Sequence, residues 1–252
     1  ASLLNKPLII HEQNSIPGLT NKILAQLADR IFIGFPAVRL ANSVRTACSG
    51  NPVRFEIARI DPPEKRFAGR QGRLNVLVIG GSLGAQALNA IVPQALKLVP
   101  EQFRPVVIHQ TGAAHWAAVK KNYADQALEG EVVAFIDDMA ERYAACDVVI
   151  CRAGALTIAE LSAAGVASIL VPYPHAVDDH QTNNAKFLAD CGAAMLVPQP
   201  QLTAERLADI LASLTRDQLL GMAMAARSQA KPEATRMVAE ACIDLSGARN
   251  EA

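Results

Sequence analysis

The stretch Asp147-Val148-Val149-Ile150-Cys151-Arg152-Ala153-Gly154-Ala155-Leu156-Thr157-Ile158-Ala159-Glu160 decides the fold. Residues 147–151 form a mainly apolar run of the kind that makes a buried parallel strand. The residues that follow Gly154 continue into a helical pattern, so the chain turns from strand to helix there. Such a turn presents unpaired main-chain N–H groups and the positive end of a helix dipole. The stretch therefore predicts a βα unit whose turn binds anions without a cationic side chain.

Glu160 lies one turn further along the same predicted helix, on the face of Leu156 and Thr157. A carboxylate does not bind phosphate, but it accepts hydrogen bonds from a diol such as ribose. A helix start for phosphate and an acid for sugar hydroxyls together indicate a nucleotide site. The alternative is an ordinary strand-to-helix corner whose acid complements the helix dipole. These residues alone leave the two interpretations equally balanced.

The same alternation of apolar strands and helices runs from Leu74 to the end of the chain, which predicts a Rossmann-like parallel sheet covered on both faces. The turn Gly80-Gly81-Ser82-Leu83-Gly84-Ala85 follows the first of these strands and is a second phosphate signal, although it is neither G-x-G-x-x-G nor a P-loop. Before residue 51 the pattern predicts two strands, 7–10 and 31–35, with a helix over 19–28 between them. This part is typical of the end of a second domain of the same class.

The predicted organisation has four parts. Residues 1–51 are the carboxyl-terminal remnant of a second domain, and 52–73, rich in Pro, Gly and charge, are an irregular interdomain linker. Residues 74–231 are the ligand-binding Rossmann-like domain, and 232–252 are a helix that packs back towards the first domain. The chain lacks an initiator Met and enters a strand almost at once, so we expect it to begin inside a larger protein.

Composition excludes several classes of protein. The chain has 252 residues, is 51% hydrophobic, and balances 24 Lys and Arg against 24 Asp and Glu, so no basic field indicates nucleic acid. Aromatic residues are only 4%, too few for a base-stacking platform. No apolar run reaches the roughly 18 residues that span a bilayer, and we expect no signal peptide because the amino end lacks a long apolar core. The five cysteines show no CxxC spacing, which favours free thiols in a reducing cytoplasm.

Other polar groups follow predicted strands. Asn14 is a candidate for a sugar or acyl group, or part of an Asx-turn. Arg54 either lines a cleft or lies on the linker surface. The segment 173–185 is dense in groups that hydrogen-bond hydroxyls, which favours a sugar contact over a solvated loop. Asp137 and Asp138 are best interpreted as helix-start residues, since no third ligand accompanies them to hold a metal.

Seven motifs together resemble one known family. They are His-Glu-Gln-Asn at 11–14, Pro-Gly-Leu-Thr-Asn-Lys at 17–22, Gly-Asn-Pro-Val-Arg at 50–54, Gly-Gly-Ser-Leu-Gly-Ala at 80–85, Phe-Ile-Asp-Asp-Met at 135–139, Cys-Arg-Ala-Gly-Ala-Leu-Thr at 151–157 with Glu160, and Asp-His-Gln-Thr-Asn-Asn-Ala at 179–185. Their order over the whole chain resembles the MurG family of bacterial N-acetylglucosaminyltransferases, in glycosyltransferase family 28. The resemblance implies a GT-B fold, with two Rossmann-like domains and a cleft between them.

The resemblance also implies an activity. The family are hexosyltransferases that move N-acetylglucosamine from UDP-N-acetylglucosamine to the C4 hydroxyl of undecaprenyl-diphospho-muramoylpentapeptide, lipid I. The anomeric configuration inverts, and the products are lipid II and UDP. No cofactor or metal is implied, because main-chain donors would stabilise the leaving diphosphate.

Carried over position by position, the resemblance places these residues at the donor: Asn14, Arg54, Ser82, Ile136, Ala155, Leu156, Thr157, Ile158, Ala159, Glu160, His180 and Gln181. The main chain of Ile136 would meet uracil, and Glu160 the ribose hydroxyls. Ser82 and the helix start at 155–157 would hold the diphosphate.

The remaining implied contacts concern the sugar and the cleft. Gln181, with His180, would hold the N-acetylglucosamine hydroxyls, Asn14 would face the acetamido group, and Arg54 would line the cleft near the nucleotide. The family's amino-terminal glycine-rich loops and proposed catalytic base are absent from this sequence, and His11 is not promoted to that role. We therefore expect weak UDP-sugar binding and no transfer by this chain alone.

The implied partners are the donor, the lipid I acceptor and the cytoplasmic face of the bacterial inner membrane, met peripherally through the absent region. Two alternatives remain at this stage. One is a UDP-N-acetylglucosamine 2-epimerase with the same fold and donor. The other is a non-catalytic donor-binding subunit of a split transferase.

Overall fold

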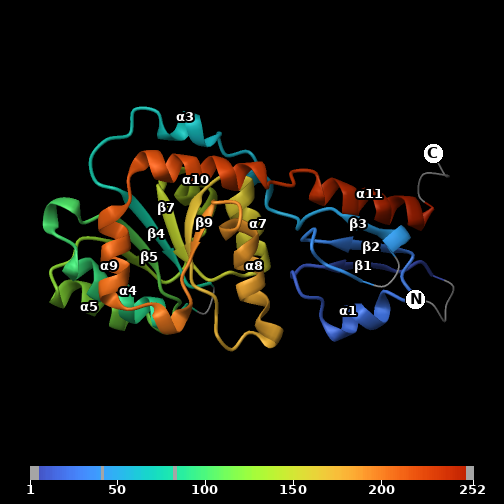
Figure 1. Ribbon diagram of the computed structural model, residues 1–252, viewed down its shortest axis with the longest axis horizontal. Helices are drawn as coiled ribbons and strands as arrows, with labels where there is room; N and C mark the ends of the chain where they lie inside the picture. Colours follow the sequence, from blue (N-terminus) through green and yellow to red (C-terminus); the bar gives the residue numbers. More distant parts are fainter. Residues whose placement is uncertain (1–5, 41–42, 82–83, 248–252) are drawn as a thin grey trace.

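The computed structural model describes residues 6–40, 43–81 and 84–247 (Figure 1). Its main feature is a six-stranded parallel sheet in the order β6-β5-β4-β7-β8-β9. The strands are β4 (Asn75–Ile79), β5 (Val106–Gln110), β6 (Glu131–Val133), β7 (Val148–Cys151), β8 (Ala167–Leu170) and β9 (Ala194–Leu196). The predicted α/β class with a parallel Rossmann-like sheet is confirmed.

The strand order reverses at the centre of this sheet. From β4 the chain moves outward through β5 and β6, and then returns to β7 on the other side of β4. β4 and β7 are paired in register, with Ile79 beside Cys151 at their carboxyl ends. The segments that leave these two ends run in opposite directions, which opens a crevice where ligands bind in folds of this kind.

Helices cover both faces of the sheet because its strands alternate side chains between two cores. Val76 and Val78 of β4 face one cluster, which includes residues of α4 (Gln86–Leu98), α5 (Trp116–Asp125), α9 (Ala204–Ser213) and α10 (Arg216–Ser228). Leu77 and Ile79 face the other, with α6 (Met139–Ala145), α7 (Ala155–Ala164) and α8 (His180–Ala189). This period of two is what a strand buried on both faces requires.

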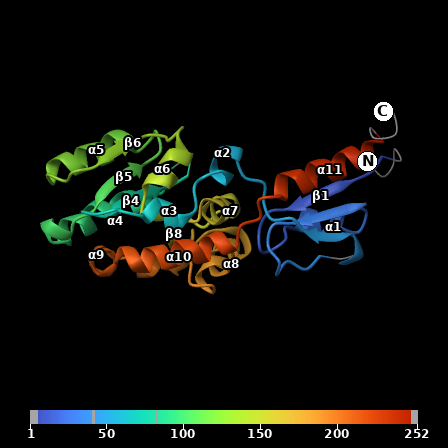
Figure 2. The ribbon, with the colours of Figure 1, turned by 90° about the horizontal axis from the view of Figure 1, so that it is seen from above.

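A smaller unit lies at the other end of the molecule (Figure 1). It holds a parallel sheet in the order β1-β2-β3, formed by β1 (Ile9–Glu12), β2 (Arg30–Ile33) and β3 (Thr46–Cys48). The helix α1 (Leu19–Leu24) is shorter than the predicted 19–28, and β3 was not predicted. α11 (Ala234–Ser246) crosses over and lies beside this unit, where Met237 and Phe32 line one small cavity (Figure 2).

The segment 52–73 between the units is more ordered than predicted. It contains two short helices, α2 (Phe55–Ala58) and α3 (Pro63–Phe67). Arg66 donates to the carbonyls of Tyr143 and Ala164, at 3.1 and 3.0 Å, near the ends of α6 and α7. A cation at a helix's carboxyl end complements its dipole. The prediction of an irregular linker is therefore wrong in this respect, because arginine contacts fix the segment to the large unit.

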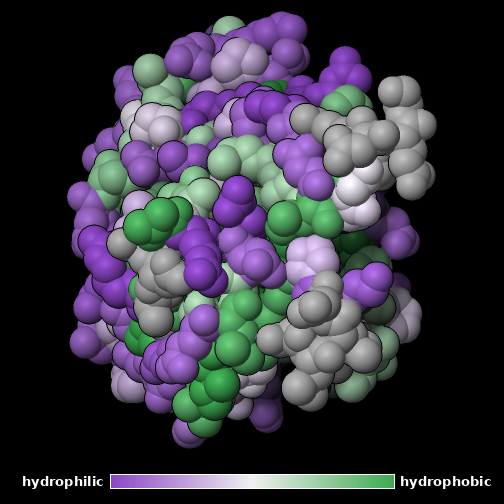
Figure 3. Space-filling view, turned by 90° about the vertical axis from the view of Figure 1, so that its right-hand side faces the viewer, coloured by the Kyte–Doolittle hydropathy of each residue, from purple (hydrophilic) through white to green (hydrophobic). Residues whose placement is uncertain are grey.

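The end of the molecule formed by the small unit mixes hydrophilic and hydrophobic surface (Figure 3). Leu19, Ile23 and Leu27 are 74, 56 and 55% exposed and lie four residues apart along α1 and the turn after it. Contiguous exposed apolar side chains are typical of a contact surface. Over the described ranges, no helix combines the length and the apolar character that crossing a membrane demands.

Candidate functional site

A cavity of about 890 Å³ opens at the carboxyl ends of β4 and β7, where the strand order reverses. Its walls are formed by loops that follow the strands of the large sheet and by the first turns of α4, α7 and α8. The lining residues are Ile79, Gly80, Gly81, Gly84, Ala85, Gln86, Ala87, Ala90, His115, Cys151, Arg152, Gly154, Thr157, Tyr173, His175, Gln181 and Gln199. Both turns that the sequence singled out for phosphate, 80–85 and 154–157, therefore border one cavity.

The glycines of the first turn are required by close backbone approach. A Cβ on Gly84 would lie 1.9 Å from the carbonyl oxygen of Thr111, and φ is +77° there. A Cβ on Gly80 would lie 2.2 Å from the amide nitrogen of Ala85. Glycine removes both conflicts and lets the main chain itself form the cavity wall. Ser82, which the sequence placed at the diphosphate, lies outside the described residues.

Two uncapped helix starts face this cavity. Gly154 is the N-cap of α7 and Ala85 that of α4, and neither helix has a side-chain cap. The first N–H groups of a helix have no intrahelical partner, so those of residues 155–157 are available to a ligand. Thr157 adds a hydroxyl to the cavity lining. The geometry suits an anion held by main-chain donors and two dipole ends.

Ile158 and Ala159 complete the predicted run on α7 but lie further along the helix. The N–H of Ile158 already donates to the Gly154 carbonyl at 2.9 Å, and its side chain is buried. The free main-chain donors of this run are therefore those of Ala155, Leu156 and Thr157.

Glu160 lies beyond the cavity lining and has two protein partners. Its Oε1 accepts from Arg54 at 3.2 Å, and its Oε2 accepts from the hydroxyl of Tyr143 at 3.2 Å. The Arg54 side chain is 51% exposed and the Glu160 side chain 19%. Burial, and then the nearby Glu160 charge, raise the pKa of Tyr143 well above its usual value. The phenol therefore stays protonated and acts as a donor to this carboxylate.

The small unit reaches the site through its polar loop after β1. Asn184 of α8, fully buried, accepts from the N–H of Ser15 at 2.9 Å and donates to Asn14 Oδ1 at 3.3 Å. Asn51 donates to the carbonyls of Gln13 and Ala155, at 3.0 and 3.4 Å. These amides place Asn14 next to the start of α7, although residues 14 and 155 are far apart in the chain.

Gln181 lines the cavity, and its Oε1 accepts from the N–H of Tyr173 at 2.9 Å. His180 precedes it at the start of α8, and its carbonyl accepts from the hydroxyl of Ser15 at 3.5 Å. Ile136 is buried and lies three residues before α6, close in sequence to Arg142 and Tyr143 on that helix. Of the predicted residues that the structure describes, Thr157 and Gln181 thus line the cavity, whereas Arg54 and Glu160 pair outside its lining.

Sequence reasoning missed several cavity-lining groups. Arg152 donates to the carbonyls of Val171 and Pro172 and to Gln199 Oε1, the last at 2.6 Å. Burial lowers the pKa of this arginine, and its guanidinium lies over the ring of Tyr173. Its position directly after β7, at a strand's carboxyl end, could have identified Arg152 as a candidate site residue. His115 lines the cavity from the N-cap of α5, and nothing in the sequence around it indicated this.

The paired acids before α6 are placed as helix-start residues. Asp138 is the N-cap and accepts from Arg142 Nε at 2.9 Å. Within residues 6–40, 43–81 and 84–247, no three His, Cys, Asp or Glu side chains are grouped as a metal site would need. All five cysteines are free thiols.

A doubly wound sheet with a cavity over two helix starts, joined to part of a second parallel unit, is the architecture of the GT-B fold. The C-terminal domain profile of glycosyltransferase family 28 matches residues 75–239, and the family's N-terminal domain profile matches residues 1–33. The chain belongs to glycosyltransferase family 28, as its motifs predicted.

Named relatives point to one branch of this family. The chain is 60% identical to the UDP-N-acetylglucosamine–N-acetylmuramyl-(pentapeptide) pyrophosphoryl-undecaprenol N-acetylglucosamine transferases of Nitrosospira multiformis and Nitrosomonas europaea. The matches cover 97 and 100% of this chain and 68 and 71% of those proteins.

A solved structure points to the same branch of the family as these relatives. The crystal structure of MurG from Acinetobacter baumannii has a TM-score of 0.81 at 41% identity, and the match covers 94% of this chain and 67% of that one. A UDP-N-acetylglucosamine 2-epimerase from Listeria monocytogenes has a TM-score of 0.62 over 94% of this chain and 64% of that chain, at 11% identity, which shows a shared fold alone.

Proposed function

We propose that the chain binds UDP-N-acetylglucosamine in the cavity at the carboxyl ends of β4 and β7 and provides the donor site of an inverting hexosyltransferase. In the proposed reaction N-acetylglucosamine passes to the C4 hydroxyl of undecaprenyl-diphospho-muramoylpentapeptide, giving lipid II and UDP. The observation that carries the proposal is the meeting of two uncapped helix starts at one cavity. The names of relatives at 60% identity, which are N-acetylglucosamine transferases, support the same donor.

The chemistry follows from where charge develops. The diphosphate is the leaving group, so negative charge grows on it as the sugar's anomeric bond breaks. Fixed N–H donors at residues 155–157 and the two helix dipoles interact more strongly with that charge than with the bound donor. They need no reorganisation during the reaction. In this proposal Ser82 also contacts the diphosphate.

The nucleoside and the sugar are assigned to the surrounding groups. We assign uracil to the main chain of Ile136 and the ribose hydroxyls to Glu160, with Arg54 at the edge of the cleft. Gln181 and His180 would take the sugar hydroxyls, and Asn14 its acetamido group. The support is that hydrogen bonds tie Asn14 to α8, where both of these residues lie.

The domain assignment is likewise a proposal. Residues 1–51 would belong to the acceptor-binding unit, 52–73 to the connection, 74–231 to the donor domain, and 232–252 to a helix returning to the first unit. The position of α11 beside the small sheet supports the last assignment (Figure 2). We propose lipid I as acceptor and peripheral action at the cytoplasmic face of the bacterial inner membrane.

A direct test is calorimetric titration of UDP into the parent chain and Glu160→Ala. Loss of hydrogen bonds to a charged partner should weaken binding by roughly 1–3 kcal/mol and leave folding nearly intact. Glu101→Ala is the control, because Glu101 is exposed and its neighbours Gln102 and Phe103 lie beside Arg216 at the opposite edge of the sheet. Equal UDP affinity in parent and Glu160→Ala would remove the ribose assignment.

A 2-epimerase is separated by its chemistry. That enzyme exchanges the proton at C2 of the donor sugar, whereas a transferase does not. Incubating the chain with UDP-N-acetylglucosamine in D₂O and recording proton NMR should show no deuterium at C2. Incorporation there would favour epimerisation over transfer.

A further inference from the structure

The phenol of Tyr143 is placed unusually for a core residue. The side chain is 1% exposed and lies on α6, yet its hydroxyl donates to Glu160 Oε2 on α7 at 3.2 Å. Its carbonyl accepts from Arg66 Nη1 at 3.1 Å, which anchors the end of α6 as well. The contact therefore joins two helices by a buried donor and a partly exposed acceptor.

We propose that Tyr143 is a positioning residue for donor recognition, which holds the Glu160 carboxylate in the orientation that accepts both ribose hydroxyls. The inference rests on the proposed function, since it requires Glu160 to meet the ribose. It adds a residue that does not itself contact the donor.

The other partner of Glu160 cannot do this equally well. Arg54 is half exposed, so its ion pair is screened by water and contributes little. Tyr143 is enclosed by the core, where a hydrogen bond is stronger and the ring cannot change rotamer freely. A carboxylate offers about four acceptor positions, so one bond from Tyr143 leaves room for two from a diol.

The same helix couples this contact to the rest of the nucleoside. Ile136 lies just before α6, and Tyr143 lies within it. A single rigid element would then set both the main chain proposed for uracil and the acid proposed for ribose. Such support by packed neighbours is what keeps binding groups in productive geometry.

The test compares two ligands in each of several variants of the full 252-residue chain. UDP and 2′,3′-dideoxyuridine 5′-diphosphate differ only in the hydroxyls that Glu160 is proposed to accept. The parent should prefer UDP by roughly 10- to 100-fold, the range for hydrogen bonds to a charged group. Tyr143→Phe should lower UDP affinity about 5- to 20-fold and leave the dideoxy ligand within about twofold.

Tyr123→Phe is a matched control. Tyr123 is also buried, at 3% exposure, but its hydroxyl hydrogen-bonds His109 and does not reach Glu160. This variant should keep the parent's preference for UDP. A merely structural loss at position 143 would weaken both ligands together, so the ratio of affinities separates positioning from folding.

Glu160→Gln separates the proposed ribose role of Glu160 from the proposed positioning role of Tyr143. If it abolishes the preference for UDP and Tyr143→Phe does not, the inference is overturned and the proposed ribose role stands. If Glu160→Gln keeps the preference, the ribose role and this inference both fail. Should Tyr143→Phe not fold, 4-fluorophenylalanine at position 143 fills the same volume without a donor and gives the same decision.

Discussion

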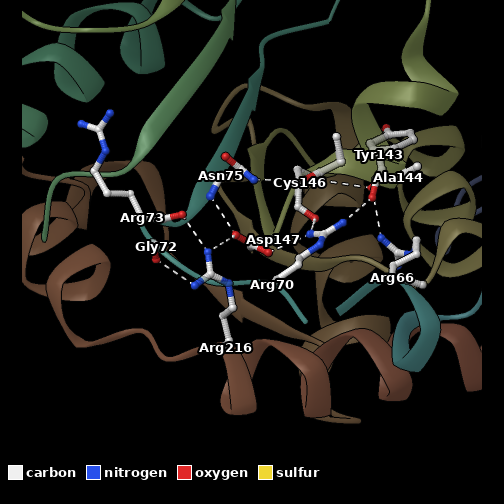
Figure 4. Close-up of polar contacts among 12 residues, drawn as sticks. Arg66, Arg70, Gly72, Arg73, Asn75, Tyr143, Ala144, Cys146, Asp147 and Arg216 are labelled. Carbon is white, nitrogen blue, oxygen red and sulfur yellow. Dashed lines mark hydrogen bonds and ion pairs between the residues drawn. The ribbon is translucent and has the colours of Figure 1, made fainter. Parts of the chain in front are cut away.

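The two edges of the large sheet treat polar groups in opposite ways. At the amino edge, Asp147 is fully buried and accepts from Arg70 at 2.7 Å, from the N–H of Asn75 at 2.8 Å and from Arg216 at 3.4 Å (Figure 4). At the carboxyl edge, α4 and α7 begin without side-chain caps and face a cavity. One edge satisfies its charges internally, while the other leaves donors for a ligand.

The arginines at the amino edge of the sheet donate mainly to main-chain carbonyls. Arg70 donates to the carbonyls of Ala144 and Cys146 and Arg66 to those near the ends of α6 and α7, while Arg216 donates to the carbonyls of Gly72 and Arg73. Among these three arginines, Arg216 has one buried nitrogen, Nε, without a hydrogen-bond partner. Because the donors of this arginine cluster bond to main-chain carbonyls, the cluster has a structural role. The chemistry of an edge therefore depends on which groups remain unpaired.

The largest effect on stability should come from disrupting the arginine cluster at its acceptor, Asp147. Asp147→Asn removes a fully buried charge that compensates two partly buried guanidinium groups, so we expect a loss of roughly 3–5 kcal/mol in unfolding free energy. Urea denaturation followed by circular dichroism measures it. The UDP affinity of the remaining folded molecules should change less than about twofold, because Asp147 lies at the opposite edge.

The control is the exposed ion pair of the same region. Glu129→Gln breaks the Arg73–Glu129 pair, whose side chains are 40 and 75% exposed, and should cost less than about 1 kcal/mol. If both substitutions destabilised the chain equally, internal satisfaction of the amino edge would not explain its stability.

A pH titration should reveal a second satisfied network beneath the ligand edge. His109 is fully buried between Tyr123 and Asn89, and Asn89 donates to the Thr111 carbonyl against which Gly84 packs. Burial lowers the pKa of His109 to about 4. The unfolded chain therefore takes up this proton near pH 6.5, before the folded chain does.

Stability should accordingly be full above about pH 6.5 and fall by about 3 kcal/mol as the pH drops towards 4. Denaturant midpoints collected over that range measure the slope. His109→Gln, with no titrating group, should be less stable at neutral pH but show a shallower decline. An unchanged slope in this variant would assign the pH dependence to other groups.

The sequence predicted the two turns that border the cavity better than the hydrogen-bond network around them. The glycine-rich turn and the start of α7 are local features, read from a strand followed by glycine and a helical pattern. β3 was missed because Thr46–Cys48 is too short to show a period. The Tyr143–Glu160 contact depends on how α6 packs against α7, which residue spacing does not report.

Main-chain donors at α7 can be tested individually, with an intermediate effect. Ala155→Pro removes one N–H at the first helical position, where proline is tolerated, and Gly154 already has the extended φ and ψ that precede proline. Helix content should persist, whereas UDP affinity should fall by roughly 1–3 kcal/mol. Ala155→Gly, which keeps the N–H, is the control, and equal affinities in the two would argue against main-chain binding of the diphosphate.

The smallest effect should come from giving the start of α7 the side-chain cap that it lacks. Gly154 has φ −64° and ψ 145°, and a Cβ there would meet only Thr157 Oγ1 at 3.5 Å, so serine fits as an N-cap. In Gly154→Ser the new hydroxyl accepts from the first turn of α7, which should raise stability by a few tenths of a kcal/mol. The same bond occupies a donor meant for the ligand, so UDP affinity should fall by roughly 1 kcal/mol. Thermal unfolding and calorimetry should therefore move in opposite directions, and a variant that gained or lost both together would show that the cap and the diphosphate do not compete for the same N–H groups.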